Sequence, residues 1–361
     1  MVPAIASRVP LVRRPKAPAL PLEERITHLT GLTVAPAGAS HHDLVARASG
    51  VLNYAALIAS DVGMPALATE LCWRQHRTFA KAGSLTGTIA VMSLMPLINI
   101  SRLLTREGDG EAAYDVLTRL YRAAQKRGTA EIHGHTVDLT ALISTDADHR
   151  KVCEELWTTL LIDGARALAR VGRWTEAADA MNAHRGVGNR LLDGRQIAIM
   201  ALMERGLDQQ ALDMIDATVP IEPWETTVAA LLRAHCRPAM PGLDLDLVLR
   251  ETTSLLAALE PSYSVFQTRA GLAALGLLHD LTDPHVTTLT DAVTTTAALD
   301  AYAAREVLHH PVARWHLTET QQQRLDAVIS EAGLGNGSLS HHQHSVDDAV
   351  QKAEAALRAC F

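Results

Sequence analysis

Apolar side chains recur every three or four positions through most of the chain from residue 22 onward. This spacing is typical of amphipathic α-helices, because it places the apolar residues along one face of a 3.6-residue repeat. No stretch of the sequence requires a β-strand, so we expect an all-α protein. Two segments lack the pattern, namely the proline-rich residues 1–21 and the glycine- and histidine-rich residues 334–344.

A glycine followed five residues later by an alanine marks four of the breaks between predicted helices. The pairs are Gly63/Ala68, Gly108/Ala113, Gly172/Ala177 and Gly206/Ala211. Glycine suits a tight turn between two antiparallel helices, because such a turn needs a residue with positive φ. Alanine suits the start of the second helix, where a larger side chain would push the two helices apart. We therefore predict helical hairpins at these four places.

The segment GRWTEA, residues 172–177, resembles the turn of the tetratricopeptide repeat, a helical hairpin of about 34 residues. Trp174 stands where that family usually has an aromatic residue, and Gly172 and Gly206 are 34 residues apart. The other turn glycines are separated by 45 and 64 residues, which indicates insertions. The resemblance implies a right-handed superhelix of antiparallel helical hairpins, an α-solenoid, over residues 22–224.

Helical periodicity continues over residues 225–333 without the glycine signature, so we expect further hairpins that extend the array. After Pro284 one long helix is predicted, with a single buried stripe formed by Leu289, Val293, Ala297, Tyr302 and Leu308. The last helix of this part is predicted to begin after Thr318, a favourable N-cap residue, and to stop at Gly333.

The two ends of the chain differ from the array. Residues 1–21 hold five prolines, four basic residues and no acid, which predicts a disordered basic arm or a tail that docks on an acidic partner. Residues 334–344 are expected to form a flexible linker. Residues 345–361 are expected to form an amphipathic helix that either caps the last hairpin or docks on another protein.

Composition narrows the class of partner. The net charge of −7 argues against nonspecific nucleic-acid binding, which needs a basic surface. Residues 84–104 are apolar but contain Pro96 and Asn99, so we expect a buried core helix and no membrane span. The four cysteines are widely separated, which favours reduced thiols in a cytoplasmic protein. Abundant alanine and arginine indicate a GC-rich bacterial genome.

Motifs for catalysis are missing from the sequence. Neither a G-x-S-x-G elbow nor a phosphate-binding G-x-x-x-x-G-K-[ST] loop occurs. Histidines cluster at 133–135, where Glu131 and Asp138 flank them, and at 341–344. Neither cluster has the ligand spacing of a zinc site, so we expect no catalytic residue, no metal and no cofactor.

The first helices of the predicted hairpins would line the concave wall of a solenoid, where such proteins bind their partners. The polar residues at these positions are Asn53, Asn99, Arg102, Arg166, Arg170 and Gln196. The tetratricopeptide resemblance implies that Asn99 and Arg102 match family positions that hold a peptide carboxylate. Alternatively, the arginines pair with Glu107, Asp163 or Glu204 on neighbouring turns.

These observations favour a non-catalytic protein that binds a peptide or protein partner in its concave groove, with an acidic segment or a carboxylate as one candidate ligand. A second hypothesis is the ligand- or peptide-sensing module of a bacterial regulatory system. A third is an enzyme whose site is built within the helical array and cannot be recognised from the sequence.

Overall fold

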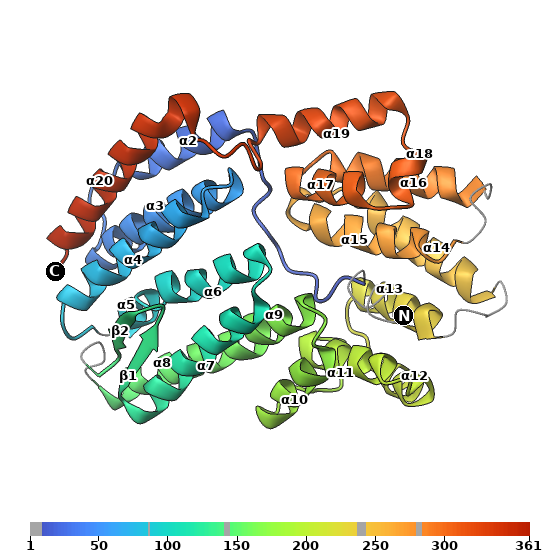
Figure 1. Ribbon diagram of the computed structural model, residues 1–361, viewed down its shortest axis with the longest axis horizontal. Helices are drawn as coiled ribbons and strands as arrows, with labels where there is room; N and C mark the ends of the chain where they lie inside the picture. Colours follow the sequence, from blue (N-terminus) through green and yellow to red (C-terminus); the bar gives the residue numbers. More distant parts are fainter. Residues whose placement is uncertain (1–8, 86, 141–144, 237–242, 279–283) are drawn as a thin grey trace. The chain divides into compact units, whose positions relative to one another are not determined.

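The computed structural model describes residues 9–85, 87–140, 145–236, 243–278 and 284–361. Helices dominate this part of the chain, which agrees with the all-α class (Figure 1). One antiparallel β-hairpin also occurs, formed by β1 (Thr129–Ile132) and β2 (His135–Asp138). The expectation that no strand is present is therefore wrong at this hairpin.

Contacts divide the chain into two compact units. Unit N comprises Leu22–Val171 and Gly333–Phe361, and unit C comprises Met1–Pro21 and Gly172–Ala332. The division falls at the Gly172 turn, inside the region expected to form one array of hairpins. Each unit therefore contains segments from distant parts of the sequence.

Unit N is built from helical hairpins, the β-hairpin and a helix from the end of the chain. Its helices are α2 (Leu22–Leu32), α3 (His41–Asp61), α4 (Pro65–Lys81), α5 (Gly87–Met92), α6 (Met95–Glu107), α7 (Gly110–Lys126), α8 (Asp146–Thr159), the π-helical turn η1 (Leu160–Gly164), α9 (Ala165–Arg170), the 3₁₀ turn η3 (Ser340–His342) and α20 (Gln343–Ala359). Helix α3 packs against both α4 and α20, so the last helix of the chain covers the first hairpin.

Unit C continues with shorter helices. They are α10 (Trp174–Ala183), α11 (Asp193–Glu204), α12 (Asp208–Asp216), α13 (Pro223–Cys236), α14 (Leu243–Ala257), the 3₁₀ turn η2 (Pro261–Tyr263), α15 (Ser264–Leu275), α16 (Pro284–Ala297), α17 (Ala301–His309), α18 (Ala313–His316) and α19 (Glu319–Glu331). Helices α13 and α14 pack together, in the region where the sequence predicts further hairpins. Thr318 caps α19 with a capping box, and Gly333 has a φ of +68° just beyond its end.

The four predicted turn glycines adopt left-handed backbone conformations. Their φ values lie between +69° and +91°, at Gly63, Gly108, Gly172 and Gly206. The alanine five residues after each glycine is completely buried, with no exposed surface at Ala68, Ala113, Ala177 and Ala211. Both results confirm the physical reasons for this spacing, namely a turn that needs positive φ and a tight helix crossing.

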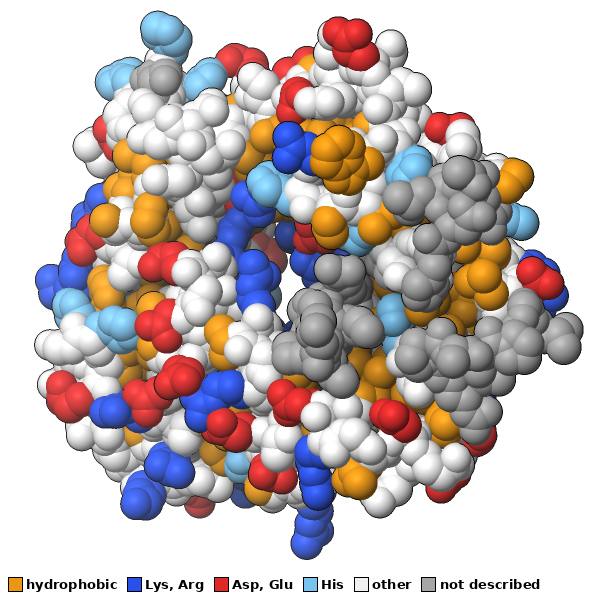
Figure 2. Space-filling view, turned by 45° about the vertical axis from the view of Figure 1, so that its right-hand side comes forward, with side chains coloured by type: hydrophobic (Ala, Val, Ile, Leu, Met, Phe, Trp, Pro, Cys, Tyr) orange, Lys and Arg blue, Asp and Glu red, His pale blue; other side chains and the backbone are white. Residues whose placement is uncertain are grey.

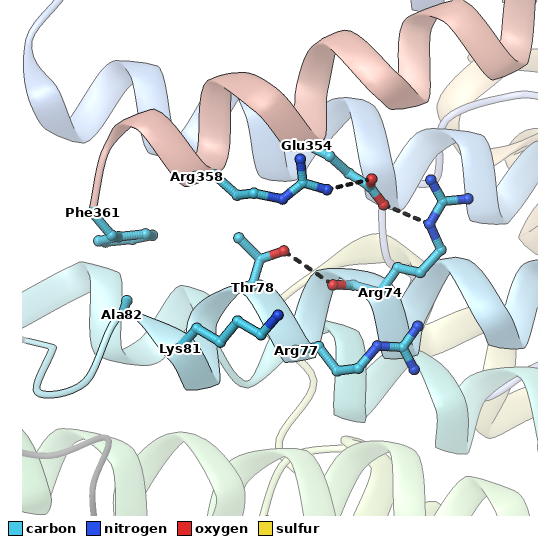
Figure 3. Close-up of a pocket in the computed structure, with 8 residues that line it drawn as sticks. All are labelled: Arg74, Arg77, Thr78, Lys81, Ala82, Glu354, Arg358 and Phe361. Carbon is cyan, nitrogen blue, oxygen red and sulfur yellow. Dashed lines mark hydrogen bonds and ion pairs between the residues drawn. The ribbon is translucent and has the colours of Figure 1, made fainter.

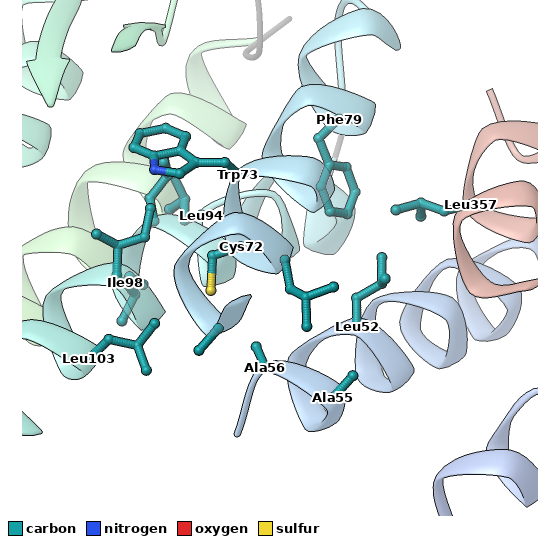
Figure 4. Close-up of a cluster of buried hydrophobic side chains, with 14 of the residues drawn as sticks. Leu52, Ala55, Ala56, Cys72, Trp73, Phe79, Leu94, Ile98, Leu103 and Leu357 are labelled. Atoms are coloured by element: carbon teal, nitrogen blue, oxygen red, sulfur yellow. The ribbon is translucent and has the colours of Figure 1, made fainter. Parts of the chain in front are cut away.

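The core of unit N draws on several of these helices (Figure 4). Phe79 of α4 and Leu52 of α3 are completely buried, and Leu357 of α20 lies in the same cluster. Burial of large apolar side chains stabilises each by about 1.5–3 kcal/mol relative to exposure. The apolar face predicted for the terminal helix is therefore buried within this chain, but against the first hairpin and not, as the sequence suggests, against the last one.

Two predicted helices are interrupted. The apolar stretch 84–104 folds as α5 and α6 with a turn between them, and Pro96 occupies the first turn of α6. By length and hydropathy alone residues 87–107 qualify as a candidate membrane span, but half of that window is buried inside the structure. The helix predicted after Pro284 breaks between α16 and α17, where the buried Asp300 caps α17 through the Tyr302 N–H.

Residues 334–344, expected to form a flexible linker, are held against the first hairpin of unit N. The backbone N–H of Gly335 donates to the Asp61 carbonyl at 2.9 Å, and that of Gly337 donates to the Val62 carbonyl at 2.6 Å. Gly63 faces Gly335 so closely that an added Cβ would lie 3.5 Å from its Cα. The glycines of this segment therefore permit a close backbone crossing over the turn.

Candidate functional site

In unit N, three of the predicted binding residues lie close together on the first helices of two neighbouring hairpins. We define the polar row as Asn53 on α3, Asn99 and Arg102 on α6, and Asp163 in η1. Asn99 Nδ2 donates to Asn53 Oδ1 at 3.0 Å, and Asn99 Oδ1 accepts from an Arg102 terminal nitrogen at 3.3 Å. Both the nitrogen and the oxygen of the Asn99 side-chain amide therefore form hydrogen bonds within the polar row.

Arg102 ends the row in an ion pair with Asp163. Its Nε lies 2.8 Å from Asp163 Oδ2, and 48% of the arginine side chain is exposed. Pairing with Asp163 is the alternative that the sequence left open for these arginines. Because an exposed ion pair contributes only about 0–1 kcal/mol, an incoming carboxylate could replace Asp163 at little cost.

The remaining predicted residues are placed differently. Arg166 is half-buried and Arg170 is exposed, both on α9, one and two helical turns beyond the row in sequence. Gln196 belongs to unit C, where it is 1% exposed and donates to the Leu191 carbonyl at 2.7 Å. Gln196 therefore stabilises the start of α11 and does not reach the polar row.

The histidine cluster at 133–135 forms the turn of the β-hairpin. His133 and Gly134 both have positive φ, as a two-residue hairpin turn requires. The flanking carboxylates are engaged locally, because Glu131 accepts from Thr136 and Asp138 accepts from Thr140. Within the described residues no group of three or more metal-ligating side chains occurs, at this hairpin or elsewhere.

The basic arm, expected to be disordered, runs along unit C from residue 9 to residue 21 as an extended segment (Figure 1). Arg13 lies 3.0 Å from Glu260, and its guanidinium stacks 3.5 Å from the centre of the Tyr263 ring. The backbone N–H of Lys16 donates to the Ser262 carbonyl at 2.8 Å. These contacts fix the arm at the turn that precedes α15.

Two further cations of the arm have partners on other helices of unit C. Arg14 forms an ion pair with the buried Asp193 at the start of α11. The Lys16 ammonium lies 3.4 Å from the centre of the Tyr302 ring on α17. Each cation of the described arm therefore meets a carboxylate or an aromatic face, and we call these contacts together the arm site.

Asp300 adds a buried carboxyl group to the arm site. Burial raises the pKa of Asp300, while the N–H groups of Tyr302 and Ala19 and the charge of Lys16 act in the opposite direction. Ala19 is itself buried, with 5% of its surface exposed. The arm thus contributes both a backbone donor and a positive charge to this carboxyl group.

Sequence reasoning did not identify the arm site. Its acidic and aromatic members lie between residues 193 and 302 and come from three separate places in the sequence, so no local motif joins them. The one signal in the sequence was the alternation of cations with prolines in the arm. This composition is equally typical of a disordered tail.

The face of the protein displayed in Figure 2 has mixed charge. Figure 2 shows acidic and basic side chains interspersed over much of the face that it displays. Comparisons with protein-family models, curated proteins and solved structures find no match to this chain.

Proposed function

We propose that the protein is a non-catalytic, cytoplasmic helical-array protein that binds an extended peptide segment of a partner on the surfaces of its helical hairpins. The observation that supports this proposal best is the arm site. There a proline-rich segment without regular secondary structure is bound along three separate elements of unit C by backbone and side-chain contacts. A surface that holds such a segment from its own chain has the chemistry to hold one from a partner.

The partner segment that fits the arm site is extended, basic and proline-containing. Proline presets the backbone at φ near −65° and removes conformations that binding would otherwise have to exclude, which favours affinity. Two carboxylates and two tyrosine rings select arginine and lysine through ion pairs and cation–π contacts. In this proposal the arm is a resident occupant that a partner segment of similar chemistry displaces.

The polar row of unit N is proposed as a second contact, for a carboxylate or for backbone amides of a partner. Arginine can hold a carboxylate through two parallel hydrogen bonds, and asparagine offers both a donor and an acceptor. We also propose that the hairpins are divergent relatives of the tetratricopeptide repeat, stacked as a right-handed superhelix. The left-handed turn glycines and the buried alanines that follow them support this assignment.

A labelled peptide with the sequence of residues 9–21 tests the arm site. We expect it to bind weakly to the wild-type full chain, because the resident arm competes at an effective concentration of about millimolar. The full-length variant Arg13→Glu/Arg14→Glu/Lys16→Glu should release its own arm. It should therefore bind the peptide at least about tenfold more tightly in a fluorescence-anisotropy titration, and added salt should weaken the complex.

The control for this experiment keeps the arm variant and adds Tyr263→Ala and Glu260→Lys, which should abolish the gain. A peptide of the same composition in scrambled order measures binding by net charge alone. Equal peptide affinity for the wild-type chain and the arm variant would contradict the proposed peptide-binding surface.

A further inference from the structure

A cavity of about 370 Å³ lies between α4 and α20 in unit N (Figure 3). Its walls carry more positive than negative charge, although the whole chain has a net charge of −7. The polar lining consists of Arg74, Arg77, Thr78 and Lys81 from α4, and Glu354 and Arg358 from α20. The size lies at the lower end of the range of about 300–1,000 Å³ that small-molecule sites occupy.

One buried carboxylate positions two of the four cations. Glu354, whose side chain is 8% exposed, accepts from Arg74 Nε at 2.6 Å and from a terminal nitrogen of Arg358 at 2.9 Å. Figure 3 shows this carboxylate between the two arginines, with Arg358 on the same helix and Arg74 reaching it through Nε from α4. A guanidinium has five N–H donors, so each arginine keeps donors that Glu354 does not use.

The other two cations, Arg77 and Lys81, differ in whether a carboxylate lies close enough to neutralise their charge. Arg77 pairs at 2.6 Å with Glu70, which is not part of the cavity lining. In the described part of the chain, no carboxylate lies within ion-pair distance of the Lys81 ammonium. The hydrogen bond to Glu354 raises the pKa of Arg74, and the charges of Glu70 and Asp347 act in the same direction.

One end of the cavity is apolar. Phe361 and Ala82 line it there, and the Phe361 ring is tilted against Phe79 with 5.8 Å between their centres. About 45% of Phe361 remains exposed, so an apolar group in the cavity would cover part of this ring. The site therefore offers cations along α4 and an aromatic surface beside them.

We infer that this cavity binds a small phosphate monoester that carries an aromatic or apolar group. The lining holds four cations and one carboxylate, and a second carboxylate, Glu70, pairs with Arg77 from outside the lining, so positive charge remains in excess. A phosphate dianion matches this excess, and its oxygens can accept the N–H donors of Arg74 and Arg358 that Glu354 does not use. The aromatic group would lie against Phe361. The cavity shares no residue with the arm site, so this inference stands apart from the peptide-binding proposal.

Isothermal titration calorimetry on the full chain tests this inference with phenyl phosphate as the probe. We expect phenyl phosphate to bind more tightly than inorganic phosphate, because only phenyl phosphate also covers Phe361. Phenol, which lacks the charge, should give no measurable binding. Absence of binding by phenyl phosphate would overturn the inference.

The variant Lys81→Met should weaken phenyl phosphate binding about tenfold or more, since it removes a charged hydrogen-bond donor. Lys81 is exposed and makes no ion pair with any residue that the structure describes, so the variant should fold normally, and Lys81→Arg should retain binding. Lys126→Met is the matched control, because Lys126 is also exposed and is also the last residue of its helix, α7. Equal affinities of Lys81→Met and Lys126→Met would show that the phosphate does not occupy this cavity.

Discussion

At the scale of single residues, His76 has an environment unlike that of a free histidine. His76 is 5% exposed on α4, and its ring lies 5.8 Å from that of Trp73, edge to face. Trp73 in turn stacks on His135 of the β-hairpin at 4.0 Å. Burial, with smaller contributions from His135 and Arg77, lowers the pKa of His76 to about 4.

This shift predicts a pH-dependent stability. Between pH 6.5 and pH 4 the unfolded chain binds a proton at His76 that the folded chain does not bind, so stability falls as the pH falls through this window. A shift of this size corresponds to roughly 3 kcal/mol at most. Urea unfolding of wild type and His76→Gln should therefore show a difference in free energy that changes between pH 7 and pH 4. A constant difference across this range would contradict the lowered pKa.

At the scale of helices and turns, close packing between elements decides where a side chain is tolerated. Gly110 begins α7, and a Cβ at this position would lie 2.1 Å from the Ala167 carbonyl oxygen of α9. Gly50 lies inside α3, and a Cβ there meets nothing within 4 Å. The same substitution should therefore have opposite effects at the two positions.

We expect Gly110→Ala to destabilise the protein by about 1–3 kcal/mol, because α7 and α9 must move apart. Gly50→Ala should stabilise it by about 0.5–1 kcal/mol, because alanine favours a helix interior. Thermal or urea unfolding of the two variants measures whether the free energy of unfolding falls for Gly110→Ala and rises for Gly50→Ala. If both variants were destabilised to the same extent, the close crossing of α7 and α9 would be wrong.

The helices could be predicted from the sequence because their signals are local. Apolar spacing, Thr318 as an N-cap and the turn glycines each act within a few residues, and the structure has helices and turns at these places. The β-hairpin was missed because its strands are four residues long, too short for an alternating pattern to stand out. The break at Asp300 was missed because apolar residues continue at helical spacing on both sides.

The contacts between distant residues could not be predicted in the same way. Asn53, Asn99 and Arg102 were named from their places on first helices, and the structure joins them by hydrogen bonds. Gln196 was named by the same argument but is buried, because α11 is enclosed on almost all sides. Which face of such a helix is covered depends on packing partners far away in the sequence.

At the scale of the whole molecule, segments far apart in the chain meet at Asp61 in unit N. The Asp61 carboxylate, which has no exposed surface, pairs with Arg25 of α2 at 2.5 Å and also with Arg106 of α6. Its carbonyl accepts from Gly335, in the segment that leads to α20. Asp61 therefore connects α2, α6 and the segment that leads to α20.

Replacing Asp61 should loosen unit N selectively. Asp61→Ala leaves the nearly completely buried Arg25 without the carboxylate it pairs with, and breaking a buried ion pair costs about 3–5 kcal/mol. Because the two units are separate compact bodies of contacts, the added opening should be confined to one of them. Hydrogen exchange followed by mass spectrometry should then speed up in residues 22–171 and 333–361 while residues 172–332 keep their protection. Asp115→Ala is the control, because Asp115 pairs with Arg119 at the surface of the same unit and should change little. Faster exchange throughout the chain in Asp61→Ala would mean that the two units open as one cooperative body.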